Sequence, residues 1–165
     1  RPRRPIMIKG LHHNAYRCRN SEETRRFYED FLGLPLIHSL EIAITKTGRD
    51  TKVLHTFYQM DDGSCLAFFD DPDTPFEFKT QRDFDLHIAL EVEHSHLLKM
   101  LEKGKARGIE TRGISDHGFI DSIYFRDPNG YVIELAAKRS GHDQQIDTRV
   151  DARAILDQWS AGRAH

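Results

Sequence analysis

Two histidines and one glutamate have the residue types and the placement needed to hold a metal ion. Glu134 lies in the otherwise apolar stretch 131–136, where a carboxylate must be paired, hydrogen-bonded or bound to a metal. His13 and His87 lie in two separate stretches with strand-like alternation, and we expect both to face inward. Two imidazoles and one carboxylate leave open positions on Fe(II), Mn(II), Ni(II), Co(II) or Zn(II). The sequence therefore predicts a metal site at His13, His87 and Glu134.

The hairpin that carries Glu134 is fixed by its turn, Asp-Pro-Asn-Gly at 127–130. The proline presets φ, and the glycine can adopt the left-handed conformation that closes a three-residue loop with a bulge. Such a loop pairs Asp127 with Tyr131. Counting back along both strands then places Tyr124 opposite Glu134, on the same face of the sheet.

A competing assignment exists for the first histidine. A lone histidine or glutamate in a strand is usually an ordinary surface or core residue rather than a ligand. His12 lies on the opposite face of its strand from His13, so a register slip of one residue would exchange the two. We favour His13 because it and His87 fall at equivalent positions of a repeated unit.

The repeated unit is a β-α-β-β-β order of elements that occurs twice. The first copy comprises a strand over 6–18, a helix from Asn20 or Ser21 to Gly33, and strands over 34–45, 53–60 and 64–69. The second comprises a strand over 83–93, a helix over 95–107 ended by Gly108, a strand over 109–114 and the hairpin 122–136. Laying His13 on His87 places Ala15 on Ala89. The predicted fold is α+β, with two βαβββ modules forming a half-barrel around a metal cleft.

Module boundaries follow from composition. The acidic, proline-containing stretch 70–75 cannot continue a strand and predicts a linker. We expect a disordered N-terminal arm over 1–6, and one domain over 7–137 with modules at about 7–72 and 83–137. A polar tail over 138–165 should contain a C-terminal helix over 151–159.

Net charge and cysteine content limit the classes of partner and the cellular compartment that we expect. The net charge of -2 gives no reason to expect nucleic acid or an anionic membrane. No apolar run approaches the ~20 residues that span a bilayer, and no signal-peptide core follows Met7. Two cysteines fit neither a disulfide framework nor a zinc spacing, so we expect a reducing, cytoplasmic location.

Four stretches resemble the vicinal oxygen chelate superfamily, which includes glyoxalase I, fosfomycin- and bleomycin-resistance proteins and extradiol dioxygenases. They are Gly-Leu-His-His-Asn-Ala at 10–15, Arg-Phe-Tyr-Glu-Asp-Phe-Leu-Gly-Leu at 26–34, Asp-Leu-His-Ile-Ala-Leu at 85–90, and Ile-Tyr-Phe-Arg-Asp-Pro-Asn-Gly-Tyr-Val-Ile-Glu at 123–134. The resemblance covers about residues 7–137. It implies paired βαβββ modules, commonly in a homodimer, with the metal ligands on His13, His87 and Glu134.

The resemblance does not fix the chemistry, because the superfamily hosts several reactions. Glyoxalase I uses a fourth ligand, a glutamate in a strand that is here 64–69 and has no carboxylate. Fosfomycin-resistance proteins place a threonine where this chain has Ala15. Bleomycin-resistance proteins lack the ligands. Extradiol dioxygenases use Fe(II), a tyrosine ten residues before the glutamate and an earlier histidine, which match Tyr124 and His117.

We therefore expect an extradiol-type oxidoreductase in which Fe(II) binds a small catecholic or enediol substrate and O2. Tyr124 would hydrogen-bond the substrate, His117 would move a proton or orient the substrate, and phenylalanines 57, 68 and 69 would wall the cleft. The acid–base histidine that such enzymes carry in the first module is missing. His55 is the candidate substitute, although we expect a strand histidine to be solvated.

Two other functions remain open. A glyoxalase-like lyase or isomerase would stabilise an enediolate and needs no O2. A binding or sequestering protein would use the cleft without chemistry, but an open metal site is a costly feature to keep for binding alone.

Overall fold

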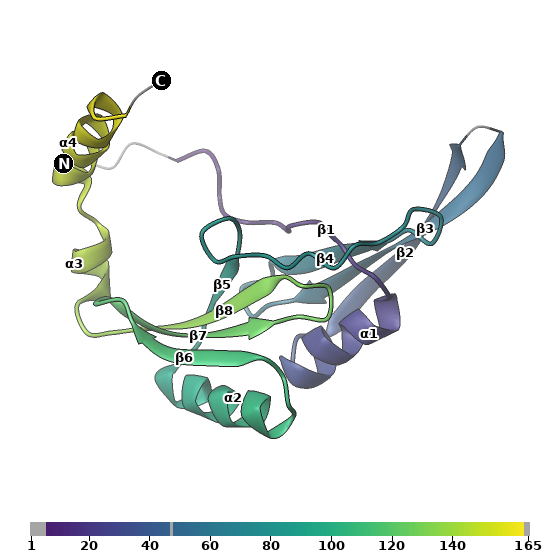
Figure 1. Ribbon diagram of the computed structural model, residues 1–165, viewed down its shortest axis with the longest axis horizontal. Coiled ribbons are helices and arrows are strands. Elements are labelled where there is room, and N and C mark those ends of the chain that lie inside the picture. The colour runs from purple at the N-terminus through teal and green to yellow at the C-terminus, as the bar shows by residue number, and fades with distance from the viewer. Residues whose placement is uncertain (1–5, 47, 164–165) are drawn as a thin grey trace. The chain divides into compact units, whose positions relative to one another are not determined.

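A computed structural model describes residues 6–46 and 48–163, which form two compact units (Figure 1). The first unit contains the described residues up to Gln81 together with the turn Asp127–Tyr131. The second contains Arg82–Arg126 and the chain from Val132 onward. Apart from Ile6, the expected N-terminal arm lies outside the described residues.

The first unit is a four-stranded sheet with one helical segment. Its elements are β1 (Tyr16–Arg17), α1 (Ser21–Arg25), η1 (Arg26–Phe31, a π-helix), β2 (Leu36–Lys46), β3 (Arg49–Gln59) and β4 (Cys65–Asp70). The strand order is β1-β4-β3-β2, and β1 runs parallel to β4. The helical segment begins as predicted, because the Asn20 side chain accepts a hydrogen bond from the backbone N–H of Glu23. It packs on the sheet through Tyr28, whose ring lies 4.7 Å from that of Phe68.

Two predictions for this unit are wrong in their extent. The expected strand over 6–18 shortens to β1, preceded by one isolated bridge between His13 and Cys65. Because β4 begins at Cys65, the residues before His12 have no strand of this sheet to pair with. The expected strands over 34–45 and 53–60 leave too long a turn between them, since β2 and β3 pair as far as Lys46 and Arg49.

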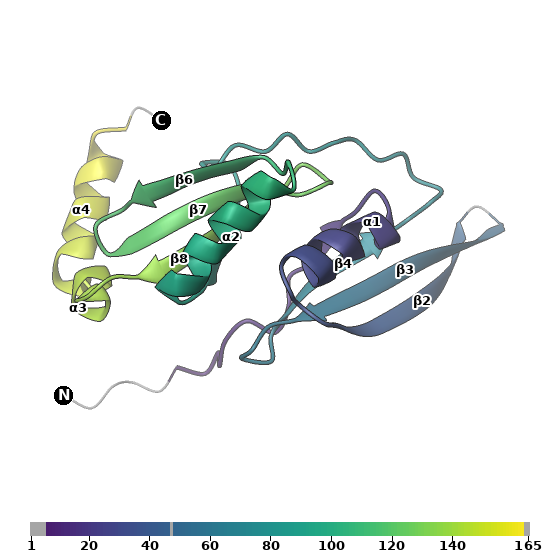
Figure 2. The same cartoon turned by 90° about the horizontal axis from the view of Figure 1, so that it is seen from below.

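The second unit repeats this plan. Its elements are β5 (Ile88–Glu91), α2 (His94–Ala106), β6 (Thr111–Asp116), β7 (Ile120–Arg126), β8 (Val132–Lys138), α3 (His142–Ile146) and α4 (Arg149–Ala161). The strand order is β5-β8-β7-β6, with β5 parallel to β8. Helix α2 covers one face of this sheet (Figure 2) and buries Leu97 and Met100. The matching strand orders confirm an α+β fold of paired βαβββ modules.

The strand expected over 83–93 is shorter than predicted, because a turn occupies its first residues. The backbone N–H groups of Asp85 and Leu86 both donate to the carbonyl of Arg82, so the chain bends there and β5 begins at Ile88. His87 therefore lies at the entrance to β5 rather than inside a strand.

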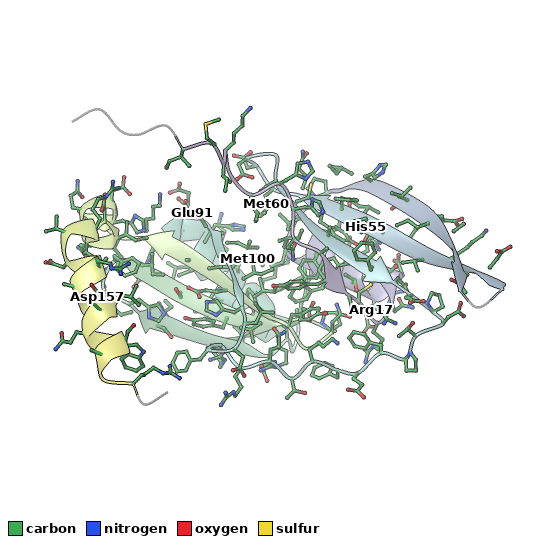
Figure 3. The ribbon with its side chains drawn as sticks, turned by 90° about the horizontal axis from the view of Figure 1, so that it is seen from above. Arg17, His55, Met60, Glu91, Met100 and Asp157 are labelled. Carbon is green, nitrogen blue, oxygen red and sulfur yellow. The ribbon has the colours of Figure 1, made fainter. Side chains whose placement is uncertain are left out.

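The C-terminal tail is helical over α3 and α4. Every residue of α4 is exposed, and Asp157 points away from the helix into solvent (Figure 3). Among the described residues, no helix has the length and apolar character needed to cross a membrane.

Candidate metal and acid–base site

Three polar side chains lie in a row across the second sheet. Arg112 of β6 is the direct cross-strand partner of Tyr124 of β7, which is the partner of Glu134 of β8. The Tyr124–Glu134 pairing is the one that the Asp-Pro-Asn-Gly turn predicts. Neighbouring positions in adjacent strands place their side chains on the same face, so the three groups can contact one another.

The turn itself has the predicted geometry. The Asp127 N–H donates to the Tyr131 carbonyl at 2.9 Å, and Gly130 has a φ of 97°. The Asp127 carboxylate is buried and accepts hydrogen bonds from the Tyr28 hydroxyl (2.7 Å) and from the backbone N–H groups of Asn129 and Tyr131. Burial nevertheless raises the pKa of Asp127, because desolvation outweighs those bonds.

Glu134 is a buried carboxylate with two specific partners. It is 3% exposed, and its Oε1 lies 3.0 Å from Nε2 of His87. Its Oε2 accepts a hydrogen bond of 2.6 Å from the hydroxyl of Ser122, which is fully buried. A buried carboxylate is stable only when its charge and lone pairs are satisfied in this way.

The contacts of His87 define which of its nitrogens faces the carboxylate. Nδ1 lies 2.7 Å from the backbone carbonyl of Asp83, and since a carbonyl can only accept, Nδ1 carries a proton. The other nitrogen, Nε2, then meets a carboxylate oxygen of Glu134 across 3.0 Å. A proton or a cation must lie between these two atoms, because their lone pairs would otherwise repel. Metal-binding histidines commonly have one nitrogen fixed by such a carbonyl, so this donor set fits a divalent metal.

A second pair, His117 and Tyr124, stands beside the first. His117 lies in the turn between β6 and β7, and its Nε2 is 2.7 Å from the hydroxyl of Tyr124. Burial, followed by the negative charge of Glu134, raises the pKa of Tyr124, so its phenol keeps its proton at neutral pH. The contact brings together the two residues that the sequence predicts as catalytic.

Both pairs open into one pocket of about 570 Å³ in the second unit. Aromatic side chains at 84 and 119 and the charged groups of Asp83 and Arg112 also line it. The pocket therefore combines an imidazole–carboxylate pair that could bind a metal, a hydrogen-bonded imidazole–phenol pair and aromatic side chains, a combination typical of a small-molecule site.

The third expected ligand, His13, lies in the first unit. It is exposed, and its Nδ1 lies 2.7 Å from Nδ1 of His12. Its ring is 5.3 Å from that of Phe57 and 6.2 Å from that of His55. Among the described residues, neither unit by itself brings together three His, Cys, Asp or Glu side chains that could hold a metal.

His55 is not the solvated strand residue that we expected. His55, which is labelled in Figure 3, is 7% exposed. Its Nδ1 lies 2.9 Å from the carbonyl of Phe68, and its ring stacks on that of Phe69 with centroids 3.8 Å apart. Its strand neighbours Val53 and Phe57 are apolar, and this alternation is the signal that indicates an inward side chain. Phe68, expected to wall the cleft, is a core residue that is 1% exposed.

The internal repeat shows what the first unit does not contribute. His13 pairs with Cys65, so two residues further along Ala15 faces Ala67, as Ala89 faces Glu134 in the second unit. Ala67 therefore occupies the position equivalent to Glu134. The first unit has no carboxylate at that place, which limits the expected ligand set to three.

Sequence reasoning missed several residues of the site, among them Ser122, Asp83 and Arg112. Ser122 was detectable, since it is two residues from Tyr124 and must share its face. Asp83 and Arg112 had no comparable signal. Asp83 acts from a turn that replaces an expected strand, and the pairing of Arg112 depends on the register of β6, which shifts between Gly113 and Ser115.

Comparisons with known proteins agree with this fold. A family model described as the Glyoxalase/Bleomycin resistance protein/Dioxygenase superfamily matches residues 10–135. The chain belongs to this superfamily. Membership confirms the resemblance drawn from the four sequence stretches.

Relatives within the superfamily have different activities. The metallothiol transferase FosB of Shouchella clausii is 29% identical, with 78% of this chain and 80% of that protein covered. A lactoylglutathione lyase of Neisseria meningitidis is 28% identical, with coverages of 81% and 94%. The structure of the fosfomycin-resistance protein FosX of Listeria monocytogenes with Mn(II) and sulfate aligns with a TM-score of 0.62 at 22% identity. It covers 84% of this chain and 99% of that one, and at this identity it supports the fold alone.

Proposed function

We propose that this protein is an enzyme that uses one divalent metal ion, held by His13, His87 and Glu134, to act on a small substrate with two adjacent oxygens. The observation that carries the proposal is that the His87–Glu134 and His117–Tyr124 pairs open into the same pocket. When bound, the metal would act as a Lewis acid that polarises the substrate oxygens.

The chain's own residues would orient the ligands and move the protons. Ser122 holds one oxygen of Glu134 and leaves the other directed at His87. The Tyr124 hydroxyl can pass its proton either to a substrate oxygen or to Nε2 of His117, so the pair can give or take one proton. Because its pKa is raised, Tyr124 keeps its proton at neutral pH and can donate a hydrogen bond to a substrate oxygen.

For the reaction itself, we propose extradiol-type cleavage of a catecholic or enediol substrate, with Fe(II) as the metal and O2 as co-substrate. The support is the contact between His117 and Tyr124, because ring cleavage requires a positioned proton donor and acceptor beside the metal. The ring of Phe119 on the pocket wall suits a planar substrate.

A second candidate, a redox-neutral lyase or isomerase, is favoured by the relatives that are named as a lyase and a thiol transferase. In that reaction, His117 would remove a proton from carbon beside a carbonyl and Tyr124 would donate to the oxygen. Ala67 weighs against a four-ligand glyoxalase I arrangement, because it supplies no fourth carboxylate.

Anaerobic purification and metal analysis, followed by O2 uptake with a panel of catechols, tests the proposal. Ring cleavage predicts O2-dependent formation of a coloured product with the Fe(II)-loaded protein. Turnover of a hemithioacetal or other hydroxy-ketone under argon, with Ni(II) or Zn(II) as effective as Fe(II), would support the lyase or isomerase instead. A protein that binds no metal at all would refute both.

A further inference from the structure

Asp83 is connected to both hydrogen-bonded pairs of the pocket: its carbonyl contacts His87 directly, and its carboxylate reaches Tyr124 through Arg112. It lies in the turn at 82–86, before β5, and is one of the residues that line the pocket. The neighbouring Asp85 in the same turn pairs instead with Arg82, and neither of those two residues lines the pocket. Position in the turn alone therefore does not account for the contacts of Asp83.

The backbone carbonyl of Asp83 acts on the His87–Glu134 pair. It accepts the proton on Nδ1 of His87 at 2.7 Å, and this leaves Nε2 directed at Glu134. If the turn moved, the imidazole would lose the partner that fixes both its orientation and its tautomer.

The carboxylate of Asp83 acts on the His117–Tyr124 pair through Arg112. It accepts two hydrogen bonds from the guanidinium, at 2.7 and 3.1 Å, in the forked geometry that fixes an arginine side chain most firmly. The same hydrogen bonding by Arg112 lowers the pKa of Asp83, so the carboxylate is ionised at neutral pH. The guanidinium carbon of Arg112 lies 4.8 Å from the centre of the Tyr124 ring, within cation–π range.

We propose that Asp83 is a positioning residue that couples the His87–Glu134 pair to the His117–Tyr124 pair, its carbonyl fixing His87 and its carboxylate holding Arg112 over Tyr124. The consequence for catalysis rests on the proposed function, but the positioning of Tyr124 does not. The alternative is that Asp83–Arg112 is an ordinary half-exposed ion pair, a type that usually contributes little.

Fluorine NMR of protein labelled with 3-fluorotyrosine tests the positioning without metal or substrate. The chain has five tyrosines, so the Tyr124 signal can be assigned by its loss in Tyr124→Phe. Asp83→Asn and Arg112→Met should each shift the Tyr124 resonance, because the cation leaves the ring face. The double variant should shift it no further. The matched control Asp85→Asn removes an ion pair from the same turn and should leave the signal in place.

Kinetics then test the consequence. With a substrate established as above, Asp83→Asn should lower kcat by about ten- to a hundredfold with little change in KM, the range expected when a catalytic group is misplaced. Arg112→Lys, which keeps a cation at this position, should lower kcat less than Arg112→Met does. An unmoved Tyr124 resonance in Asp83→Asn would overturn the inference even in an active enzyme. A moved resonance in a protein without any turnover would support the inference while the proposed function fails.

Discussion

Nε2 of His117 lies 2.7 Å from the hydroxyl of Tyr124, although His117 is in a turn and Tyr124 is in the strand that follows. The turn is held by a hydrogen bond of 3.0 Å from the His117 N–H to the carbonyl of Ile120. A hydrogen-bonded imidazole and phenol can pass a proton between them, so the pair is expected to behave as one unit.

The first prediction follows from that contact. Tyr124→Phe should retain the metal but slow turnover by roughly ten- to a thousandfold, the range for losing one positioned donor. His117→Ala should have a similar effect, and the double variant should be little worse than either single one, because the two residues act together. His94→Ala, which changes another histidine of the second unit, should leave kcat unchanged. Additive losses in the double variant would contradict a shared role.

The second prediction concerns the metal ligands. Alanine at His13, His87 or Glu134 should remove the metal and the activity together, whereas His12→Ala should do neither. Metal content after anaerobic purification measures this directly. Loss of the metal in His12→Ala with retention in His13→Ala would show that the assigned face of the first strand is wrong.

The support given to Glu134 by Ser122 yields a third prediction. Ser122→Ala removes a buried hydrogen bond of 2.6 Å without touching a proposed ligand. Metal affinity should fall by about ten- to a hundredfold, as is usual when the partner of a ligand is removed. Competition titration with a chelator measures the change. Ser64→Ala, which removes a hydroxyl from the first unit, should not change the affinity.

The parts of the site predictable from sequence are those set by short-range chemistry. The turn at 127–130 fixes its own loop type, and the alternation of β7 and β8 then places Tyr124 beside Glu134 without knowledge of the rest of the chain. The element order likewise follows from local signals such as the Asn20 cap and the apolar stripe of the helix.

The remainder depends on contacts between segments that are distant in sequence. Arg112 meets Asp83 across 29 residues, and no local pattern encodes that ion pair. The burial of His55 depends on Phe68 and Phe69 in the next strand. The strands predicted over 6–18 and 83–93 are longer than the observed ones, because the alternation of residue types continues where the chain has no partner strand or forms a turn.

The fourth prediction is a loss of stability at alkaline pH. Burial raises the pKa of the Cys18 thiol from 9.0 to about 11. The folded state therefore holds this proton more tightly than the unfolded state, so the contribution to stability is complete below pH 9.0 and is lost as the pH rises through about 11. The free energy of unfolding, measured with urea across this pH interval, should fall more steeply for the wild type than for Cys18→Ala. Parallel declines would exclude a contribution from this thiol.

The last prediction addresses how the two units cooperate. His13 belongs to the first unit, whereas His87 and Glu134 belong to the second. The sequence predicts a linker between the modules at 70–75. We expect a homodimer at micromolar concentration, measurable by light scattering, in which each metal site takes its modules from different chains.

Mixing two inactive variants distinguishes this arrangement from one within a single chain. His13→Ala and Glu134→Ala chains, unfolded and refolded together, would form mixed dimers in which one of the two sites has all three ligands. With random pairing, about a quarter of the wild-type metal content and activity should return. If each chain completes its own site, the mixture should stay as inactive as its components. A monomer across the micromolar range would rule out the shared arrangement before the mixing experiment is needed.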